Sequence, residues 1–451
     1  MTDKIVSMID ERRYTELREQ ADGMNPADLA EIFEELPTGY YAKLYRILPK
    51  ELAAETFSLM EPELQKELID SFTDKELSDV LSEMYVDDTV DMIEEMPAVV
   101  VKRILRASTA ETRNEINELL RYPKNSAGTI MTTEYVRFRK NMTVAQALEH
   151  IRKVAIDKET VYTCYVTDED RHLIGLVTAK KLLISPLDSP LEDIMEDNVI
   201  SVLTTADREE VAQMFDKYGF IAIPVVDNET RLVGIITFDD AIDVMQEETE
   251  EDFAKMAAVT PTGEPYIKTS AVRLWKARIP WLLILMISAT FTGAIISSFE
   301  AKLAACVCLT AFIPMLMDTG GNAGSQSSVT IIRGLSLDEI TFKDVFRVLF
   351  KEFSVSLMCG AVLSVVAFGK IILIDRMAFG NTAITPWIAL VVSLTLFITV
   401  ICSKLIGGAL PILAKRMGFD PAVTASPIIT TIVDAISLLV YFSVSTLILN
   451  I

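Results

Sequence analysis

The chain has 451 residues, half of them hydrophobic, and a formal net charge of −22. The first 268 residues carry 29 basic and 55 acidic side chains, whereas the remaining residues carry 13 and 9. This acidic excess excludes nucleic acid as a partner, because phosphate binding requires clustered Lys and Arg. With only two histidines, His150 and His172, a histidine metal site or a Ser-His-Asp triad has almost no basis.

The first 124 residues show helical patterns and no strand pattern. Asn25 precedes Pro26 as a helix N-cap precedes a proline at the first helical position. The short helices, divided by prolines, predict an all-α, superhelical N-terminal domain at residues 1–124. Two pairs with the spacing of a capping box predict further helix starts: Thr73 with Glu76, and Ser108 with Glu111.

Residues 125–246 contain an internal repeat. Ile130-Met131 recurs as Ile194-Met195, and the strand-like segment 172–178 recurs as 231–237. This arrangement resembles tandem CBS domains, a paired α/β regulatory module. The resemblance implies two copies, at about 125–188 and 189–246.

The second copy carries a candidate nucleotide site. In the CBS family, a Thr-x-x-Asp after the last strand can hold the ribose of a nucleotide, and Thr237 with Asp240 match this pattern. The first copy has Lys181 at the position of the Asp. ATP is therefore a candidate ligand, although the same two side chains would serve equally well as the cap of the next helix.

Five segments of the second half are long and apolar enough to cross a bilayer, which takes about 20 residues. Lys and Arg residues near these segments divide ten to three between the two sides. This asymmetry predicts a multi-pass protein of the plasma membrane with a cytoplasmic N-terminus and an extracellular or periplasmic C-terminus. The expected spans are about 279–299, 303–323, 353–374, 386–410 and 423–449.

The second expected span ends in a glycine-rich segment, Thr319 to Gln326. Three glycines within five positions predict a helix that opens at membrane depth, with free carbonyl groups facing a hydrated cation. The tripeptide Asp318-Thr319-Gly320 also occurs in aspartic proteases. It occurs once and without the strand-rich lobe that positions it, so we do not expect an enzyme.

The last span carries a row of oxygen atoms. Ser426, Thr430 and Asp434 are spaced by four, so they share one helix face. The two hydroxyls could equally well be polar contacts between helices. A carboxylate within an apolar span costs about 2.5–3.5 kcal/mol on insertion scales, so Asp434 is expected to face an ion path or a partner. Lys404 is the one plausible cation that could pair with it.

Carboxylates also crowd two stretches of the acidic half. One stretch contains Asp87, Asp88 and Asp91, and the other runs from Asp239 to Asp252. Like charges at i,i+4 destabilise a helix unless cations neutralise them, and hard oxygen ligands suit Mg²⁺ or Ca²⁺. The alternative is an acidic surface that is simply solvated.

Taken together, these motifs resemble the MgtE family of magnesium channels along the whole chain. The matching segments, in order, are Pro-Trp-Leu-Leu (280–283), Gly-Gly-Asn-Ala-Gly-x-Gln (320–326), Asp-Pro-Ala (420–422) and Asp434. The resemblance implies a multidomain membrane protein with an all-α N-terminal domain, tandem α/β CBS domains (125–246), a connecting helix (247–272) and a five-helix membrane domain (273–451).

The resemblance also implies roles for particular residues. It implies a homodimer in the lipid bilayer whose pore binds hydrated Mg²⁺ at Asp434, with Thr430 and Ser426 on the same face. Gly320, Gly321 and Asn322 would shape the pore wall. The implied regulatory Mg²⁺ ligands are Asp87, Asp91, Asp207, Glu209, Asp240, Asp243, Glu248, Glu251, Asp252 and Asp420.

The sequence therefore predicts a Mg²⁺-selective uptake channel that is gated by intracellular Mg²⁺. One alternative is a CBS-regulated secondary transporter for another divalent cation or solute. Another is a nucleotide-sensing module with a membrane anchor, which Asp434 disfavours.

Overall fold

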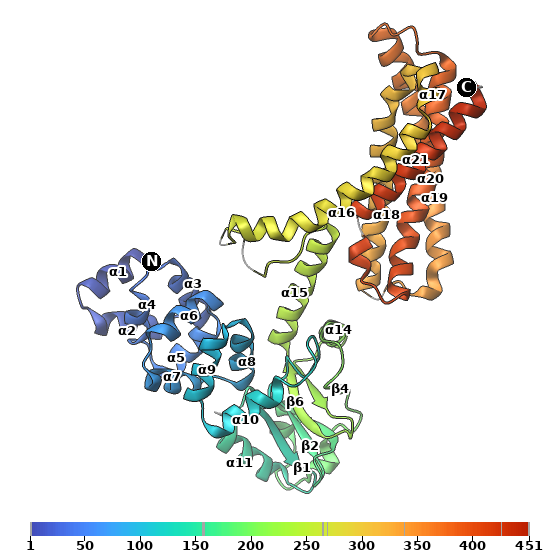
Figure 1. Cartoon of the computed structure of the whole chain (residues 1–451). Helices are drawn as coiled ribbons and strands as arrows, with labels where there is room; N and C mark the ends of the chain where they lie inside the picture. Colours follow the sequence, from blue (N-terminus) through green and yellow to red (C-terminus); the bar gives the residue numbers. More distant parts are fainter. Residues whose placement is uncertain are drawn as a thin grey trace. The chain divides into compact units, whose positions relative to one another are not determined.

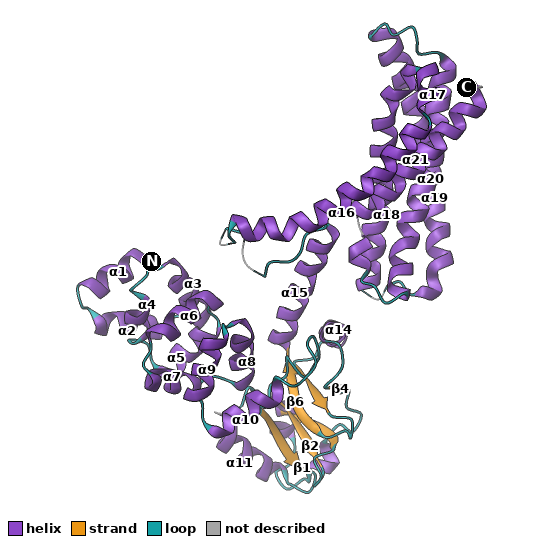
Figure 2. Ribbon diagram, viewed as in Figure 1, coloured by secondary structure: helices purple, strands orange, loops and turns teal. Residues whose placement is uncertain are grey.

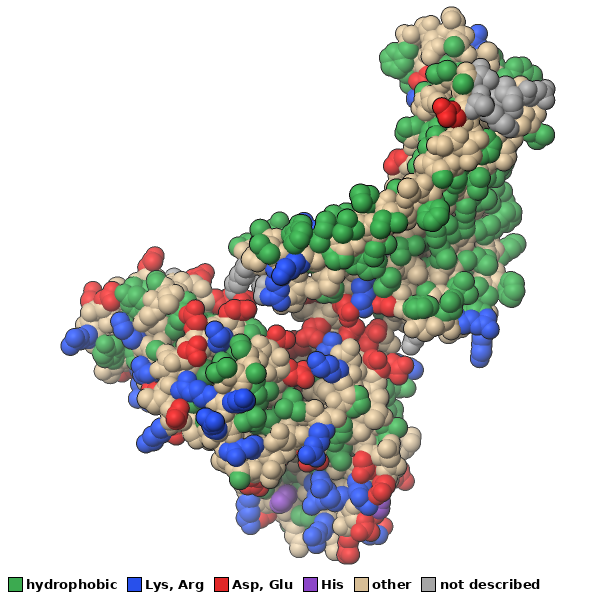
Figure 3. All heavy atoms as spheres, viewed as in Figure 1, with side chains coloured by type: hydrophobic (Ala, Val, Ile, Leu, Met, Phe, Trp, Pro, Cys, Tyr) green, Lys and Arg blue, Asp and Glu red, His purple; other side chains and the backbone are tan. Residues whose placement is uncertain are grey.

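The computed structural model describes residues 2–155, 158–263, 266–267, 269–337, 339–424 and 426–449, without the side chains of 301, 302, 305 and 426. The chain divides into two compact units, Met1–Met245 and Gln246–Ile451, which we call the soluble unit and the membrane unit. Acidic and basic side chains are scattered over the visible face of the soluble unit, whereas hydrophobic side chains cover much of the visible face of the membrane unit (Figure 3).

The N-terminal part of the soluble unit is helical, as predicted (Figure 1). Its core includes an aromatic cluster in which the ring of Tyr45 lies 6.0 Å from that of Phe57 and 5.0 Å from that of Phe72. The helices are α1 (Thr2–Asp10), α2 (Tyr14–Asp22), α3 (Pro26–Glu35), α4 (Tyr41–Tyr45), α5 (Lys50–Ser58), α6 (Pro62–Ser71), α7 (Asp74–Leu81), α8 (Val86–Glu95), α9 (Ala98–Ala107) and α10 (Ala110–Leu119).

Local capping explains where several of these helices begin. Asn25 accepts a hydrogen bond from the backbone of Ala27 at the start of α3, and Thr73 with Glu76 forms the predicted capping box of α7. The prediction for α10 was wrong by one residue. Its N-cap is Thr109, because the Ser108 hydroxyl instead bonds to the carbonyl of Ile104 at the end of α9.

The remainder of the soluble unit contains two small sheets, in the orders β1-β2-β3 and β4-β5-β6 (Figure 2). In each sheet the first pair of strands is parallel and the second pair is antiparallel. The elements are β1 (Tyr135–Arg139), α11 (Val144–Val154), β2 (Thr160–Thr167), β3 (Leu173–Thr178), α12 (Ala179–Ile184), α13 (Leu191–Ile194), β4 (Val202–Leu203), α14 (Arg208–Tyr218), β5 (Ala222–Val226) and β6 (Leu232–Thr237).

The repeated sequence motifs hold these two copies together. A Cβ atom on Gly234 of β6 would lie 2.7 Å from the sulfur of Met131, and one on Gly175 of β3 would lie 2.6 Å from the sulfur of Met195. Each Ile-Met motif therefore packs its methionine on the strand glycine of the other copy. The packing is reciprocal, because the methionine of each copy contacts the glycine of the other copy.

The connecting helix differs from its predicted position. It is α15 (Phe238–Met256), which begins directly after β6 rather than at residue 247, and it ends well before residue 272. Thr237 and Asp240 start this helix, since the threonine hydroxyl donates to the Asp240 carboxylate at 2.5 Å. The helix thus continues from the second CBS copy into the membrane unit.

The membrane unit consists mainly of long helices. Among the described residues, four helical segments are long and apolar enough to cross a membrane: Ala271–Ser298, Phe342–Ala378, Pro386–Arg416 and Pro421–Leu449. The elements are α16 (Ala271–Ser298), α17 (Glu300–Ala305), the 3-10 helix η2 (Val307–Phe312), α18 (Ile313–Ser336), η3 (Phe342–Asp344), α19 (Val345–Lys370), the π-helix η4 (Ile371–Ala378), α20 (Pro386–Arg416), η5 (Pro421–Thr424) and α21 (Ser426–Leu449).

The second expected span, 303–323, does not form one helix. That stretch is divided among α17, η2 and the first half of α18. Helix α18 has 24 residues and continues to Ser336. The later part of α18 is rich in Ser, Thr, Gly, Asn and Gln. Apolar length alone therefore misplaces this helix, because its second half is polar.

Candidate ion pathway and cation-binding acids

The Asp434 carboxylate lies half-buried in the middle of α21. The structure gives it no hydrogen-bond or ion-pair partner among the described residues, and Asp318 of α18 is close enough to repel it. Two unpaired acids within a membrane unit are unfavourable in lipid. The arrangement is therefore suited to a cation or to water.

The glycine-rich segment does not open the helix, so this prediction was wrong. Residues 313–336 form continuous α-helix through all three glycines. A Cβ on Gly320 would lie 2.7 Å from Thr399 of α20, and one on Gly321 would lie 3.0 Å from Thr430 of α21. The glycines allow close packing between helices, as small residues do in membrane proteins.

The opposite side of α18 is polar and exposed. Asp318, Asn322 and Gln326 are spaced by four, and all three side chains are exposed. We call these three residues the α18 polar face. Of the residues predicted for the pore wall, Asn322 belongs to this face, whereas Gly320 and Gly321 are buried against α20 and α21.

Of the three residues in the oxygen row of α21, the structure describes the side chains of Thr430 and Asp434. Thr430 is partly exposed, and its hydroxyl donates to the carbonyl of Pro427. Ser426 opens the helix, and its side chain is outside the described part of the structure. Pro427 does not break α21, since it occupies the first turn, where proline is tolerated.

Lys404 does not pair with Asp434. It is buried, and its ammonium donates to the hydroxyl of Ser327 at 3.3 Å. Asp434 therefore keeps an uncompensated charge within the described membrane unit. This result strengthens the case that the carboxylate has a ligand from outside the chain.

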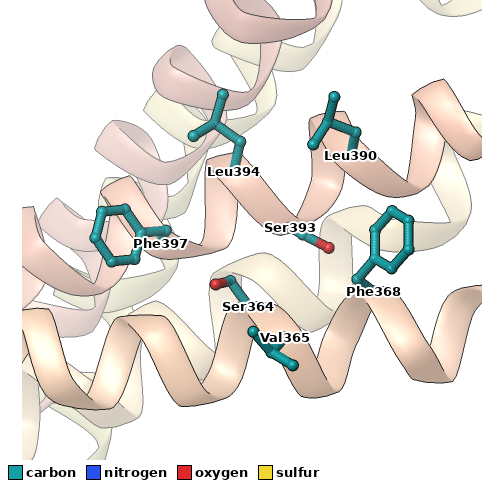
Figure 4. Close-up of a pocket in the computed structure, with 7 residues that line it drawn as sticks. All are labelled: Ser364, Val365, Phe368, Leu390, Ser393, Leu394 and Phe397. Atoms are coloured by element: carbon teal, nitrogen blue, oxygen red, sulfur yellow. The ribbon is translucent and has the colours of Figure 1, made fainter.

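An apolar pocket of about 310 Å³ lies between α19 and α20 (Figure 4). Its lining includes Val365, Phe368 and Phe397, and no charged side chain contributes to it. A hydrated cation needs oxygen ligands, so this pocket is unsuited to ion passage.

In the soluble unit, carboxylates from four parts of the chain come together. We call them the acid cluster: Asp87, Asp88 and Asp91 of α8, Glu134 and Glu159 just before β1 and β2, and Asp239 and Asp240 of α15. The backbone N–H of Glu159 donates to the carbonyl of Glu134 at 2.9 Å. Folding thus gathers acids that are far apart in the sequence.

Desolvation and mutual repulsion raise the pKa values of these acids. The pKa rises to about 7 for Asp240, through burial first and then the charge of Asp87. It rises to about 8 for Glu159 for the same reasons, in the same order. Asp91 keeps part of its surface in water, yet its pKa also rises to about 8. These shifts mean that ionising the cluster is unfavourable without a cation.

The cluster has features that fit a hydrated divalent cation. Oδ1 of Asp87 is buried and has no hydrogen-bond partner among the residues that the structure describes. Within the described ranges, no three His, Cys, Asp or Glu side chains are placed to hold a metal ion together. Mg²⁺ keeps several of its waters and needs only one or two carboxylates, so pairs of these acids would suffice.

The remaining predicted regulatory acids lie in three places. Asp207 is the N-cap of α14 and accepts from the backbone of Glu209, so its position has a local structural explanation. Asp243 lies on α15 beside Asp239, and burial raises its pKa. Glu248 lies on the same helix. Burial raises the pKa of the neighbouring Asp252, and the charges of Asp420 and Glu248 add to this effect.

The end of α15 contacts the start of the last span through a lysine. Lys255 donates to Glu251 at 2.5 Å and to Asp420 at 2.6 Å. Asp252 accepts from the hydroxyl of Ser336 at 3.1 Å. In this arrangement one ammonium group already forms ion pairs with two acids that the family resemblance assigns to Mg²⁺.

Sequence reasoning missed four members of these sites. Glu134 and Glu159 have no acidic neighbour at helical spacing, so no local signal marks them. Gln326 could have been found from its spacing of four with Asn322. Lys255 could have been noticed as a cation four residues after Glu251.

Family models match most of the chain. Residues 24–125 match the MgtE intracellular N domain, residues 127–187 and 191–247 match the CBS domain, and residues 313–444 match MgtE, a divalent cation transporter.

Relatives of known name match nearly end to end. The magnesium transporter MgtE of Thermus thermophilus is 37% identical over 438 residues, which are 96% of this chain and 95% of the relative. The magnesium transporter MgtE of Bacillus subtilis is 32% identical over 447 residues, which are 98% and 96% of the two chains.

Solved structures match the soluble part. The cytosolic domain of the Mg²⁺ channel MgtE in complex with ATP is 35% identical, with a TM-score of 0.52, and the match covers 54% of this chain and 100% of that chain. The soluble part of a magnesium transporter is 32% identical, with a TM-score of 0.52, over 55% and 97%. These findings and the apolar helices identify a multi-pass membrane transporter of Mg²⁺ and not an enzyme: the chain belongs to the MgtE family of magnesium transporters.

Proposed function

We propose that two copies of the chain form a Mg²⁺-selective channel in which Asp434 binds hydrated Mg²⁺. The observation that carries this proposal is the unpaired carboxylate of Asp434 near Asp318 on the α18 polar face. Acids, amides and hydroxyls on a membrane helix are costly against acyl chains, so they are expected to face water or protein. A path between two copies supplies both.

The proposed membrane domain has five spans: α16, α18, α19, α20 and α21. The basic residues near the span ends favour a topology with the soluble unit in the cytoplasm and the C-terminus outside the cell. In this topology α18 and α21 bring Asp318, Asn322 and Gln326 together with Thr430 and Asp434. The ion would pass with its water shell. The side-chain oxygens of these residues can accept hydrogen bonds from those water molecules.

We further propose that cytoplasmic Mg²⁺ closes the channel by binding to the acid cluster. Repulsion among Asp87, Asp91 and Asp240 would drive the helical domain and α15 apart when Mg²⁺ is scarce. Bound Mg²⁺ would stabilise the compact form and shift the population towards the closed state, provided that it binds this form more tightly. The acids at the end of α15 and Asp420 would transmit the change to α21.

ATP is a second proposed ligand of the CBS domains, because a related cytosolic domain was crystallised with it. In the present structure, Thr237 and Asp240 bond to each other at the start of α15. A nucleotide would have to compete for these groups. Binding of ATP would therefore loosen the helix cap and would change the charge of the acid cluster at the same time.

The pore assignment is tested by Mg²⁺ uptake into proteoliposomes that contain the full chain. Asp434→Asn should reduce uptake at least about tenfold, because it removes the charge that attracts the ion. The matched control is Asp375→Asn, since Asp375 has its own cation, Lys370, at 2.8 Å. Unchanged uptake by the Asp434 variant would refute the pore assignment.

The alternative, a secondary transporter for another divalent cation or solute, makes a different prediction. A channel conducts down a Mg²⁺ gradient when no other ion gradient is present. A secondary transporter stops when the coupling gradient is dissipated. Uptake with Mg²⁺ as the sole asymmetric ion therefore separates the two functions.

A further inference from the structure

A second polar site lies inside the membrane unit and joins three helices. The hydroxyl of Ser327 on α18 donates to Oε2 of Glu352 on α19 at 2.6 Å. The ammonium of Lys404 on α20 donates to the same hydroxyl at 3.3 Å. Ser327 is 2% exposed and Lys404 is 5% exposed. We call this group of three residues the polar clamp.

The helix backbones leave room for the clamp. A Cβ on Gly407, one turn after Lys404, would clash with the carbonyl oxygen of Gly324 in α18. A Cβ on the next residue, Gly408, would lie 3.2 Å from Cγ of Glu352. The absence of a side chain at Gly407 therefore allows α18 to approach α20, and its absence at Gly408 leaves space for the methylene groups of Glu352.

The clamp members depend on one another. Glu352 and Lys404 carry opposite charges, and Ser327 connects them through one oxygen atom. Removing one partner of a buried charge pair leaves the other uncompensated, whereas removing both avoids that cost. Hydrogen bonds between membrane helices also depend on orientation, so the clamp restricts rotation of α18.

The position of Ser327 gives this restriction a functional consequence. Ser327 lies nine residues after Asp318, which at 3.6 residues per turn is about half a turn around α18. The clamp thus holds the side of the helix that is opposite Asp318. Fixing one side of a helix fixes the direction in which the other side points.

We propose that Glu352, Ser327 and Lys404 are positioning residues that hold the α18 polar face at the depth and rotation required for ion passage. The proposal rests on the proposed function for the role of that face. The coupling within the clamp itself does not depend on it.

The test uses the full chain with the variants Glu352→Gln and Lys404→Met and the double variant. Each protein is reconstituted in proteoliposomes, and its KM and maximal rate are measured for Mg²⁺ and for Co²⁺, per folded molecule. Thermal unfolding in detergent is measured in parallel. Lys370→Met is the matched control, because Lys370 also pairs with an acid but is exposed.

Each single variant should reduce the maximal rate for Mg²⁺ at least about fivefold and should change the ratio of Mg²⁺ to Co²⁺ transport. The double variant should recover to within about twofold of the original chain in rate and in unfolding temperature. Lys370→Met should change neither.

Additive losses in the double variant would overturn the clamp. If the single variants reduced only the amount of folded protein, with transport per molecule and the ion ratio unchanged, the positioning role would be overturned. A failure of the proposed pore function is recognised separately, by normal transport through the Asp434→Asn variant. The unfolding temperatures would still report the coupling in that case.

Discussion

The acid cluster of the soluble unit can be tested by removing one charge and keeping the shape of the side chain. In Asp240→Asn, the remaining oxygen can still accept from the hydroxyl of Thr237, so the start of α15 is preserved. The pKa of Asp240 is about 7 in the folded chain, compared with an ordinary value of 3.8. Burial is the largest cause, and the charges of Asp87 and Asp239 add to it.

This shift sets the size of the expected effect. A difference of about three pKa units corresponds to about 4 kcal/mol at 1.36 kcal/mol per unit. Asp240 is partly open to solvent, and its neighbours titrate together with it, so we expect about half of this, ~2 kcal/mol. The folded-state pKa lies above the unfolded value, so the penalty is absent below about pH 4 and complete above about pH 7.

The assay is limited proteolysis of the full chain, with and without Mg²⁺, between pH 5 and pH 8. At pH 8 without Mg²⁺, the Asp240→Asn chain should be cleaved about 30-fold more slowly between the helical domain and the CBS domains, which corresponds to ~2 kcal/mol. At pH 5 the difference should be much smaller, because the original carboxyl is then largely protonated.

The added protection by Mg²⁺ should also decrease, because one acid that attracts the ion is gone. Glu31→Gln, at an exposed position on α3, is the control and should behave like the original chain. Equal cleavage of the two chains at pH 8, or an undiminished response to Mg²⁺, would refute the electrostatic argument.

Two further predictions concern glycines. Gly407→Ala places a methyl group against the carbonyl of Gly324 and should lower the unfolding temperature in detergent. Gly369→Ala, whose Cβ would meet no described atom within 4 Å, should not lower it. Gly234→Ala would meet the sulfur of Met131 at 2.7 Å and should destabilise the soluble unit by about 1–3 kcal/mol, measured by urea unfolding. The same Cβ would lie 2.8 Å from the backbone carbonyl oxygen of Thr132, which, unlike the methionine side chain, cannot rotate away. No loss of stability in either glycine variant would contradict the packing.

Local sequence signals predicted much of the fold. Caps such as Asn25 and the Thr73–Glu76 pair depend on residues within one turn, so they can be recognised directly. The CBS repeat was also visible, because its motifs recur in order. What the repeat could not reveal was that Met131 packs on the glycine of the other copy.

The errors occurred where several physical explanations share one sequence pattern. Glycines in a membrane segment can open a helix or allow two helices to approach each other. The closeness of Thr399 to Gly320 shows that this glycine allows close packing. An acidic residue can be a ligand or a cap, and Asp207 is a cap. Glu134 and Glu159 join the acid cluster only through the tertiary fold.

The structure also distinguishes acids that have a cationic partner within the chain from acids that have none among the described residues. Glu352 has Lys404 through Ser327, and Asp420 has Lys255. A carboxylate with its own cation has little affinity left for Mg²⁺, because an ion must first displace the ammonium group.

Asp434 and the acid cluster are different, because the charged groups near Asp434 and Asp91 are other acids and not cations. Burying such groups without a partner is unfavourable, and the Mg²⁺ ions that we propose to bind there would offset this cost. The same kind of ion could bind at both sites, since hydrated Mg²⁺ needs few carboxylates. The uneven distribution of acidic residues thus acquires a physical reason: open acids in the soluble unit would sense the ion that the open acid in the membrane unit admits.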